Sequence, residues 1–226
     1  MATPITILSR PDQEDRYSRL RLVGWQIDTL QKAHILVVGA GALGNEVLKN
    51  LALLGVGFVY VTDFDMIEVT NLSRAVLFRE TDLGKTKADV VASRAHALNP
   101  DIQAISFNSD VIWQLGAGVF SRMDLVIGCV DNNAARLAIN RYCRLTKRPW
   151  VDGALSGLDG LIRVFAANQG PCYECTLTEA DYADLRHRYS CQGMHRQLKE
   201  QGVVPTTPTS ASLVAALQVA QAIALL

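Results

Sequence analysis

A glycine-rich turn between a predicted strand and a predicted helix constrains the fold of this chain more than any other feature. Residues 34–38 form a continuous apolar run, residues 39–44 read Gly-Ala-Gly-Ala-Leu-Gly, and residues 45–54 have helical apolar spacing. The pattern G-x-G-x-x-G in this position allows a tight turn and lets a helix N-terminus face phosphate oxygens. It predicts a nucleotide-binding α/β domain. The alternative is a glycine turn that serves only the packing of the helix on the strand.

Strands and helices continue to alternate along the chain, which predicts a Rossmann-like, doubly wound and mostly parallel sheet. The expected strands are residues 58–62, 102–107, 124–130, one that starts at 150, and 160–166, with helices at 86–99 and 134–147. The Pro-, Thr- and Ser-rich stretch 204–212 predicts a loop. We expect one domain over residues 1–226: an N-terminal helical segment (11–32), a nucleotide-binding core (33–170), a loop-rich, cysteine-bearing crossover segment (171–210) and a terminal helix (211–226).

The charge balance and the ends of the chain limit the partners and the location of the protein. Lys and Arg together number 22, as do Asp and Glu, so we expect no binding to nucleic acid or to an anionic membrane surface. No signal peptide opens the chain, and the apolar stretch 211–226 is shorter than the roughly 20 residues that span a bilayer. Five cysteines without a secretory signal favour a reducing compartment, and therefore the cytoplasm.

Carboxylates follow two of the predicted strands, at the edge where open α/β sheets bind ligands. Asp63 follows the strand 58–62 and can accept hydrogen bonds from ribose hydroxyl groups. Asp131 follows the strand 124–130 and can hold the magnesium ion that accompanies nucleotide phosphates. Asp131-Asn132 can also cap the following helix, and the two roles are compatible.

Cationic residues after Asp63 favour ATP over NAD as the nucleotide. The chain continues with Asp63-Phe-Asp65, Asn71-Leu-Ser-Arg74 and Gly84-Lys85-Thr-Lys87. A triphosphate carries more charge than the pyrophosphate of a dinucleotide, and its transfer chemistry needs fixed cations. Arg74 and Lys87 supply such cations and Asn71 a neutral donor, although a single Lys or Arg is usually a solvated surface charge. An NAD-dependent oxidoreductase is the main alternative.

Seven motifs occur in an order that is specific as a set. They are Arg16-Tyr-Ser-Arg19, Gly39–Gly44, Asp63-Phe-Asp65, Asn71-Leu-Ser-Arg74, Gly84-Lys85-Thr-Lys87, Asp131-Asn132 and Pro171-Cys172-Tyr-Glu-Cys175-Thr-Leu. In this order they resemble the ThiF/MoeB adenylyltransferases and the adenylation domains of ubiquitin-like-protein activating enzymes, with the second branch the closer one. Two positions depart from that family's usual pattern, because Ala42 stands for a glycine and Ala75 for a glutamine.

The resemblance implies an ATP- and Mg²⁺-dependent enzyme that adenylates the C-terminal glycine of a small β-grasp carrier protein ending in Gly-Gly. By this likeness Asp63 binds the ribose, Asp131 serves magnesium, and Arg19 reaches the phosphates bound to the partner subunit of a homodimer. The implied nucleotide site comprises Gly39, Gly41, Ala42, Gly44, Asp63, Asp65, Asn71, Arg74, Lys87, Asp131 and Asn132. Two alternatives within this fold are a non-catalytic subunit that pairs with an active partner and an enzyme that adenylates a tRNA-borne carboxylate.

The cysteines fall into three groups. Cys172-Tyr-Glu-Cys175 has the spacing of half a structural Zn²⁺ site. Members of the family usually supply a second pair downstream, and here only Cys191 follows, so the sequence leaves open whether this chain binds zinc. Cys191 follows in a cation-rich segment that favours the thiolate, and its place resembles that of the family's catalytic cysteine. We expect it to take the acyl group as a thioester, or to join an acyl-disulfide; an inert loop cysteine is the alternative. Cys129 and Cys143 are expected to be buried in the core.

Overall fold

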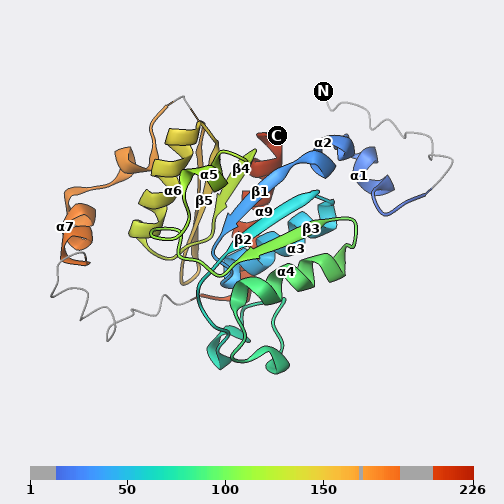
Figure 1. Cartoon of the computed structure of the whole chain (residues 1–226), viewed down its shortest axis with the longest axis horizontal. Helices are drawn as coiled ribbons and strands as arrows, with labels where there is room; N and C mark the ends of the chain where they lie inside the picture. Colours follow the sequence, from blue (N-terminus) through green and yellow to red (C-terminus); the bar gives the residue numbers. More distant parts are fainter. Residues whose placement is uncertain (1–13, 168–169, 189–205) are drawn as a thin grey trace.

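The computed structural model describes residues 14–167, 170–188 and 206–226 of the chain (Figure 1). In this part of the chain the strands form one six-stranded sheet of order β3-β2-β1-β4-β5-β6. Neighbours from β3 to β5 pair in parallel, and β6 pairs antiparallel to β5. The strands are β1 (His34–Val38), β2 (Phe58–Thr62), β3 (Gln103–Phe107), β4 (Leu125–Gly128), β5 (Trp150–Ser156) and β6 (Asp159–Phe165). The predicted doubly wound, mostly parallel fold is confirmed.

Helices cover both faces of the sheet (Figure 1). One face carries α3 (Ala42–Leu54), α4 (Lys87–Leu98) and α9 (Pro208–Ala224), and the other carries α5 (Ala117–Phe120) and α6 (Asn133–Thr146). The remaining helical elements are α1 (Ser18–Leu22), α2 (Ile27–Lys32), α7 (Glu179–Arg188) and the 3-10 turns η1 (Val69–Asn71), η2 (Glu80–Asp82) and η3 (Tyr173–Thr176). Within the described residues, no helix is long and apolar enough to cross a membrane.

The central strand shows why an uninterrupted apolar run suits this position. Side chains of a strand alternate between its two faces, so a strand covered on both sides needs apolar residues throughout. Ile35 and Val37 pack into the core beneath α3, α4 and α9. Leu36 and Val38 pack into the second core, on the side of α6. All four side chains are at most 2% exposed, which fixes β1 in the middle of the molecule.

Several predicted boundaries shift in the structure. The helix expected at 45–54 begins at Ala42, inside the glycine motif, and the strand expected at 124–130 ends at Gly128, where its neighbour β1 also ends. The loop expected at 204–212 is wrong from Pro208 onward, because α9 begins there. Thr207 caps this helix by accepting a hydrogen bond from the Ser210 N–H group, at 3.1 Å. A capping Thr followed by Pro at the first helical position is a helix start signal.

Candidate functional site

The ends of β2, β1 and β4 lie side by side at the carboxyl edge of the sheet. Val38 of β1 is in register with Thr62 on one side and with Gly128 on the other. One residue further, the Gly39 N–H group donates to the Thr62 carbonyl (2.8 Å) and the Cys129 N–H group donates to the Val38 carbonyl (2.7 Å). The chain leaves β1 toward β2, while β4 lies on the opposite side, so this is the topological switch point where open α/β sheets bind ligands.

The glycine turn is shaped by two close backbone approaches. A Cβ atom on Gly39, whose φ is +98°, would lie 2.5 Å from the Cys129 carbonyl oxygen. A Cβ atom on Gly44 would lie 2.0 Å from the Gly39 carbonyl oxygen. Gly41 differs, since a Cβ there would meet nothing within 4 Å. Gly39 and Gly44 therefore serve packing, and Gly41 leaves open space beside the first turn of α3, where unpaired N–H groups attract anions.

Asn45 is a structural element of the turn that the sequence analysis did not identify. Its side-chain amide donates to the carbonyl oxygens of Ala40 (2.8 Å) and Gly41 (2.9 Å), and its Oδ1 accepts from the Leu77 N–H group (3.0 Å). Asn45 is 0% exposed. It therefore holds the glycine turn against the segment that follows Arg74. A polar residue on the buried face of an apolar helix, directly after Gly44, was the available signal.

Asp63 is tied to the glycine turn by its carboxylate. Oδ2 accepts a hydrogen bond from the Ala40 N–H group at 2.7 Å, and Oδ1 accepts one from the Asp65 N–H group at 2.9 Å. Burial raises the pKa of Asp63 above its ordinary value, while the positive charge of Lys87 and these two hydrogen bonds oppose that rise. The predicted ribose ligand thus stands beside the turn that the phosphates are expected to approach.

Lys87, the predicted phosphate cation at the start of α4, is paired with a carboxylate of the same site. Its Nζ lies 2.7 Å from Oδ2 of Asp65, and its N–H group donates to the Asp65 carbonyl at 2.9 Å. Lys87 is 9% exposed, which is low for a lysine. The structure therefore brings Lys87 beside Asp63 and Asp65, which lie in an earlier segment of the sequence.

Asn71 and Arg74 are held within the turn around η1. The side-chain carbonyl of Asn71 accepts from the Glu68 N–H group at 3.0 Å, which leaves its NH₂ group as the donor available to a ligand. Arg74 is half-buried, and its Nη1 donates to the Thr70 carbonyl at 2.5 Å. Arg19 is exposed on α1. The two positions that depart from the family pattern, Ala42 and Ala75, are both buried.

In the loop between β4 and α6, the two predicted roles fall on different residues. Asn132 is the cap of α6, since its Oδ1 accepts from the Ala135 N–H group at 2.8 Å. Asp131 is exposed, and its Oδ1 accepts from the Asn132 side chain at 3.2 Å. An exposed carboxylate beside a switch point fits the oxygen ligands that Mg²⁺ prefers.

Behind this loop lies a buried ion network that sequence reasoning missed. Asp152 of β5 is 1% exposed and accepts from Nε of Arg136 (2.9 Å) and from Nη2 of Arg163 (2.6 Å). Arg136 is itself 6% exposed. A single Asp in an apolar strand was the signal, because a buried carboxylate requires a cationic partner.

The cysteine turn at η3 fits two of the four positions of a zinc site. Sγ of Cys172 lies 3.7 Å from Sγ of Cys175. Two sulfurs bound tetrahedrally at about 2.3 Å from zinc are about 3.8 Å apart. Within the described residues, no group of three or more His, Cys, Asp or Glu side chains has the arrangement of a metal site. The two sulfurs thus have the separation of two ligands of one tetrahedral zinc ion, and Cys191 lies outside the described residues.

The thiols of the turn and of the core differ in acidity. Burial opposes ionisation of Cys172, but hydrogen bonds from the Cys175 N–H group and the Asn140 side chain outweigh it and lower the pKa of the thiol. Burial raises the pKa values of Cys129 and Cys143 far above the ordinary thiol range. These two cysteines are thus poor nucleophiles. Cys143 is buried in the core as predicted, whereas Cys129 is only half-buried and lies just beyond the end of β4.

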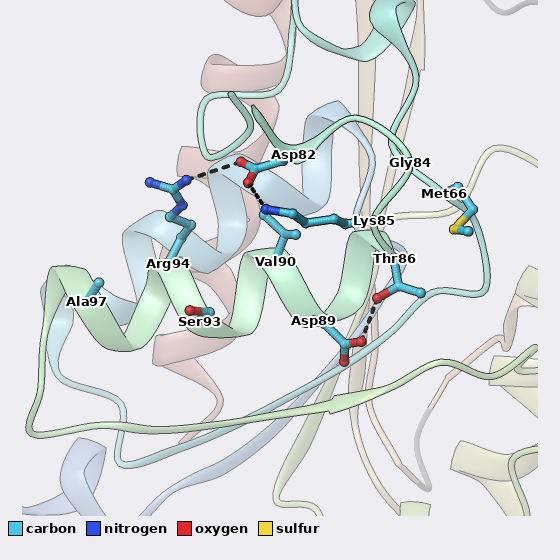
Figure 2. A pocket seen from close by; sticks show the side chains of 10 residues that line it. All are labelled: Met66, Asp82, Gly84, Lys85, Thr86, Asp89, Val90, Ser93, Arg94 and Ala97. Carbon is cyan, nitrogen blue, oxygen red and sulfur yellow. Dashed lines mark hydrogen bonds and ion pairs between the residues drawn. The ribbon is translucent and has the colours of Figure 1, made fainter. Parts of the chain in front are cut away.

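A groove of about 730 Å³ lies on the outer side of α4, next to the candidate site (Figure 2). Its charged groups are matched by neighbours within the protein. Asp82 pairs with Lys85 (3.0 Å) and Arg94 (3.1 Å), and Asp89 accepts from the Thr86 hydroxyl (2.5 Å). The groove's lining includes no residue of the glycine turn, so we do not count it as part of the nucleotide site.

Comparisons with known proteins identify relatives of this chain. The adenylyltransferase and sulfurtransferase MOCS3 of Arabidopsis thaliana is 32% identical over 199 residues, which cover 86% of this chain and 42% of the relative. The sulfur carrier protein adenylyltransferase of Thermus thermophilus is 36% identical over 173 residues, which cover 73% and 64%. This chain therefore spans less than half the length of the first relative and under two thirds of the second.

The fold has a close counterpart among solved structures. The crystal structure of E. coli MccB with ATP superposes with a TM-score of 0.75 and 24% identity, covering 95% of this chain and 63% of the other. The model of the ThiF family matches residues 17–226, which include the glycine turn, both predicted cations and the cysteine turn. The chain belongs to the ThiF family.

Proposed function

We propose that this chain uses ATP to adenylate the C-terminal carboxylate of a small ubiquitin-like or sulfur-carrier protein. The observation that carries the proposal is the assembly of three features at the switch point. An open helix N-terminus follows the glycine turn, Asp63 is bound to that turn, and buried Lys87, paired with exposed Asp65, stands beside Asp63. The names of the two relatives above, both adenylyltransferases, support the same activity.

In the proposed reaction a carboxylate oxygen of the carrier protein attacks the α-phosphorus of ATP. The bond from that phosphorus to the bridging oxygen breaks, and pyrophosphate leaves with the electron pair. The reaction therefore requires positive charge near the phosphates as negative charge shifts onto the leaving group. Lys87 supplies it after exchanging Asp65 for phosphate oxygens, and Arg74 and Asn71 add donors. Asp131 would hold the Mg²⁺ of MgATP, which would supply further positive charge to the phosphates.

The strand order also bears on the alternative of an NAD-dependent oxidoreductase. Dinucleotide-binding folds contain two βαβαβ halves, one for each nucleotide. In this chain β4, α6 and β5 begin a second half, but β6 returns antiparallel to β5. Among the described residues the second half is therefore incomplete, which supports a site for one nucleotide. The equal numbers of cationic and anionic residues argue against a tRNA substrate, because proteins that bind nucleic acid usually carry an excess of positive charge.

Several finer points belong to the same proposal. The substrate is a β-grasp protein with a C-terminal Gly-Gly, and the enzyme acts as a cytoplasmic homodimer in which exposed Arg19 reaches the partner's site. The acyl group passes to Cys191 after adenylation. Cys172 and Cys175 hold Zn²⁺ if two further ligands are supplied from outside the described residues.

The test has a binding arm and a reaction arm. By calorimetry, MgATP should bind and NAD should not; tighter binding of NAD would overturn the proposal. With a carrier protein, the enzyme should catalyse ATP–pyrophosphate exchange, and Lys87→Ala or Arg74→Ala should lower the rate by about 10²-fold, the scale of one preorganised donor.

Matched controls come from cations close by in the sequence. Lys85 is exposed and paired with Asp82, and Arg79 is exposed and donates to nearby carbonyl groups. Lys85→Ala and Arg79→Ala should keep the parent rate. If all four variants behave alike, the predicted cations are surface charges. If only the first two lose exchange, the phosphate site is where the proposal places it.

A further inference from the structure

The exposed Asp131 is flanked by two tethers, one on each side of its loop. Before it, the Val130 carbonyl accepts a hydrogen bond from Nη2 of Arg136 at 2.6 Å. After it, Oδ1 of Asn133 accepts a hydrogen bond from the Tyr173 hydroxyl at 2.9 Å. The backbone before Asp131 is therefore held by Arg136, and the side chain of Asn133, the first residue of α6, is held by Tyr173.

Tyr173 belongs to the cysteine turn, and that turn is itself fixed to α6. The ring of Tyr173 is buried, at 1% exposure, and its N–H group donates to Oδ1 of Asn140 at 3.1 Å. The hydroxyl thus reaches Asn133 from a rigid base. The turn between Cys172 and Cys175 supports the Asp131 loop through this one residue.

Asp152 joins the two tethers. One carboxylate oxygen accepts from Arg136 at 2.9 Å, and the other accepts from Arg163 at 2.6 Å. The Arg163 guanidinium lies 4.7 Å from the centre of the Tyr173 ring, and its Nη1 donates to the Thr176 hydroxyl at 3.3 Å. Asp152 therefore orients Arg136 toward Val130 and Arg163 toward the cysteine turn at the same time.

We propose that Asp152 and Tyr173 are positioning residues for Asp131, which they hold where it binds the Mg²⁺ of MgATP; this inference rests on the proposed function. Neither residue touches the nucleotide. Mg²⁺ demands near-ideal octahedral geometry, so a ligand carried on a loosened loop binds it less well. Small displacements of a positioned group have large effects on activity, up to about 10²-fold for 1 Å.

Tyr173→Phe is the main test because it removes the hydroxyl and keeps the buried ring. We measure the Mg²⁺ concentration at which ATP binding is half-maximal, by titration at fixed ATP. Loss of the tether to Asn133 should raise this midpoint about threefold or more, and Asp152→Asn should raise it at least as far. Should Asp152→Asn fail to fold, the outcome for Tyr173→Phe still decides.

The matched control is Tyr182→Phe. The Tyr182 hydroxyl bonds Glu174 of the same cysteine turn at 3.3 Å, but it is exposed and does not reach the Asp131 loop. Its removal should leave the Mg²⁺ midpoint at the parent value. An equal shift in both tyrosine variants would overturn the inference, because it would reflect a general change in the turn.

A double mutant separates positioning from stability. Adding Tyr173→Phe to Asp131→Asn should shift the midpoint no further, since the hydroxyl acts only through Asp131. Additive shifts in the double mutant would overturn the inference. An unchanged midpoint in Tyr173→Phe would also overturn it, but the proposed function would stand as long as the parent binds MgATP normally. If the parent binds no MgATP, the proposed function fails and this inference falls with it.

Discussion

The two halves of the candidate site are held together by different kinds of contact. On the side of β1 and β2, the backbone carries the geometry, with glycines that allow carbonyl oxygens to approach and N–H groups that bond Asp63. On the side of β4, the loop of Asp131 is held by side chains, through Arg136 and Tyr173. The first half depends on the absence of side chains at its glycines, and the second depends on one buried carboxylate, Asp152, that two arginines share. The two halves should therefore fail in different ways.

The largest expected effect is a loss of stability in the second half. Asp152→Ala leaves the guanidinium of Arg136 buried without its carboxylate, and an uncompensated buried charge costs about 3–5 kcal/mol. We expect a loss of this size in the free energy of unfolding, measured with urea. The control is Asp159→Ala, an exposed Asp of the neighbouring strand, which should change stability by about 0.5 kcal/mol or less. Equal losses in both variants would show that the network contributes nothing specific.

The next effect tests the first half with two glycines of the same motif. Gly44→Ala places a Cβ atom 2.0 Å from the Gly39 carbonyl oxygen, so the helix and the turn must separate. Overpacking of this kind costs about 3 kcal/mol. Gly41→Ala meets nothing within 4 Å and should cost about 1 kcal/mol or less, the difference between Gly and Ala at a helix cap.

For Gly41→Ala the main expected effect is on nucleotide binding, whereas for Gly44→Ala it is on stability. Gly41→Ala fills the open space beside α3 and should weaken MgATP binding while the protein stays folded. Thermal unfolding and calorimetry on the pair provide the measurement. If Gly41→Ala is as unstable as Gly44→Ala, the steric account of the turn is wrong.

This contrast also explains what the sequence predicted and what it did not. The strand–turn–helix unit is local, so its glycine spacing and apolar period were enough to indicate β1, α3 and the place of Asp63 after the next strand. Asn45 bonds Leu77, and Asp152 bonds Arg136, across distances in sequence that no spacing rule covers. Such pairs depend on how strands and helices pack, which periodicity does not specify.

Boundary errors have a similar physical origin. The strand at 124–130 was expected to run through two further residues because Cys129 and Val130 are apolar. It ends at Gly128, which is in register with Val38, the last residue of β1. At α9, the Pro and Thr residues that indicated a loop are the cap and first turn of the helix. The same residue types favour loops and helix starts; here the capping Thr followed directly by Pro marks the start of α9, which packs on α3.

The smallest expected effect concerns acidity within the second half. The folded turn lowers the pKa of Cys172 by hydrogen bonds that outweigh burial, and the first of these comes from the Cys175 backbone. The thiolate of Cys172 should therefore form at a lower pH in the folded protein than in the unfolded chain, whose thiols titrate near pH 8.5. Because the pKa of Cys172 is lower in the folded protein than in the unfolded chain, ionisation of the thiol adds a little stability. This stability is fully present above the pKa of the unfolded chain and is lost as the pH falls through the pKa of the folded protein.

Alkylation with iodoacetamide from about pH 6 to about pH 10, read for each cysteine by peptide mass spectrometry, measures this acidity. Cys172 should react at lower pH in the folded protein than in urea, while buried Cys143 should react only after unfolding, because burial raises its pKa. Cys175→Ser removes the neighbouring sulfur but keeps the backbone N–H group, so most of the lowering should remain. If that variant restores an ordinary thiol, the acidity comes from the sulfur pair. If Cys172 in the parent reacts no earlier than in urea, the backbone of the turn does not stabilise its thiolate.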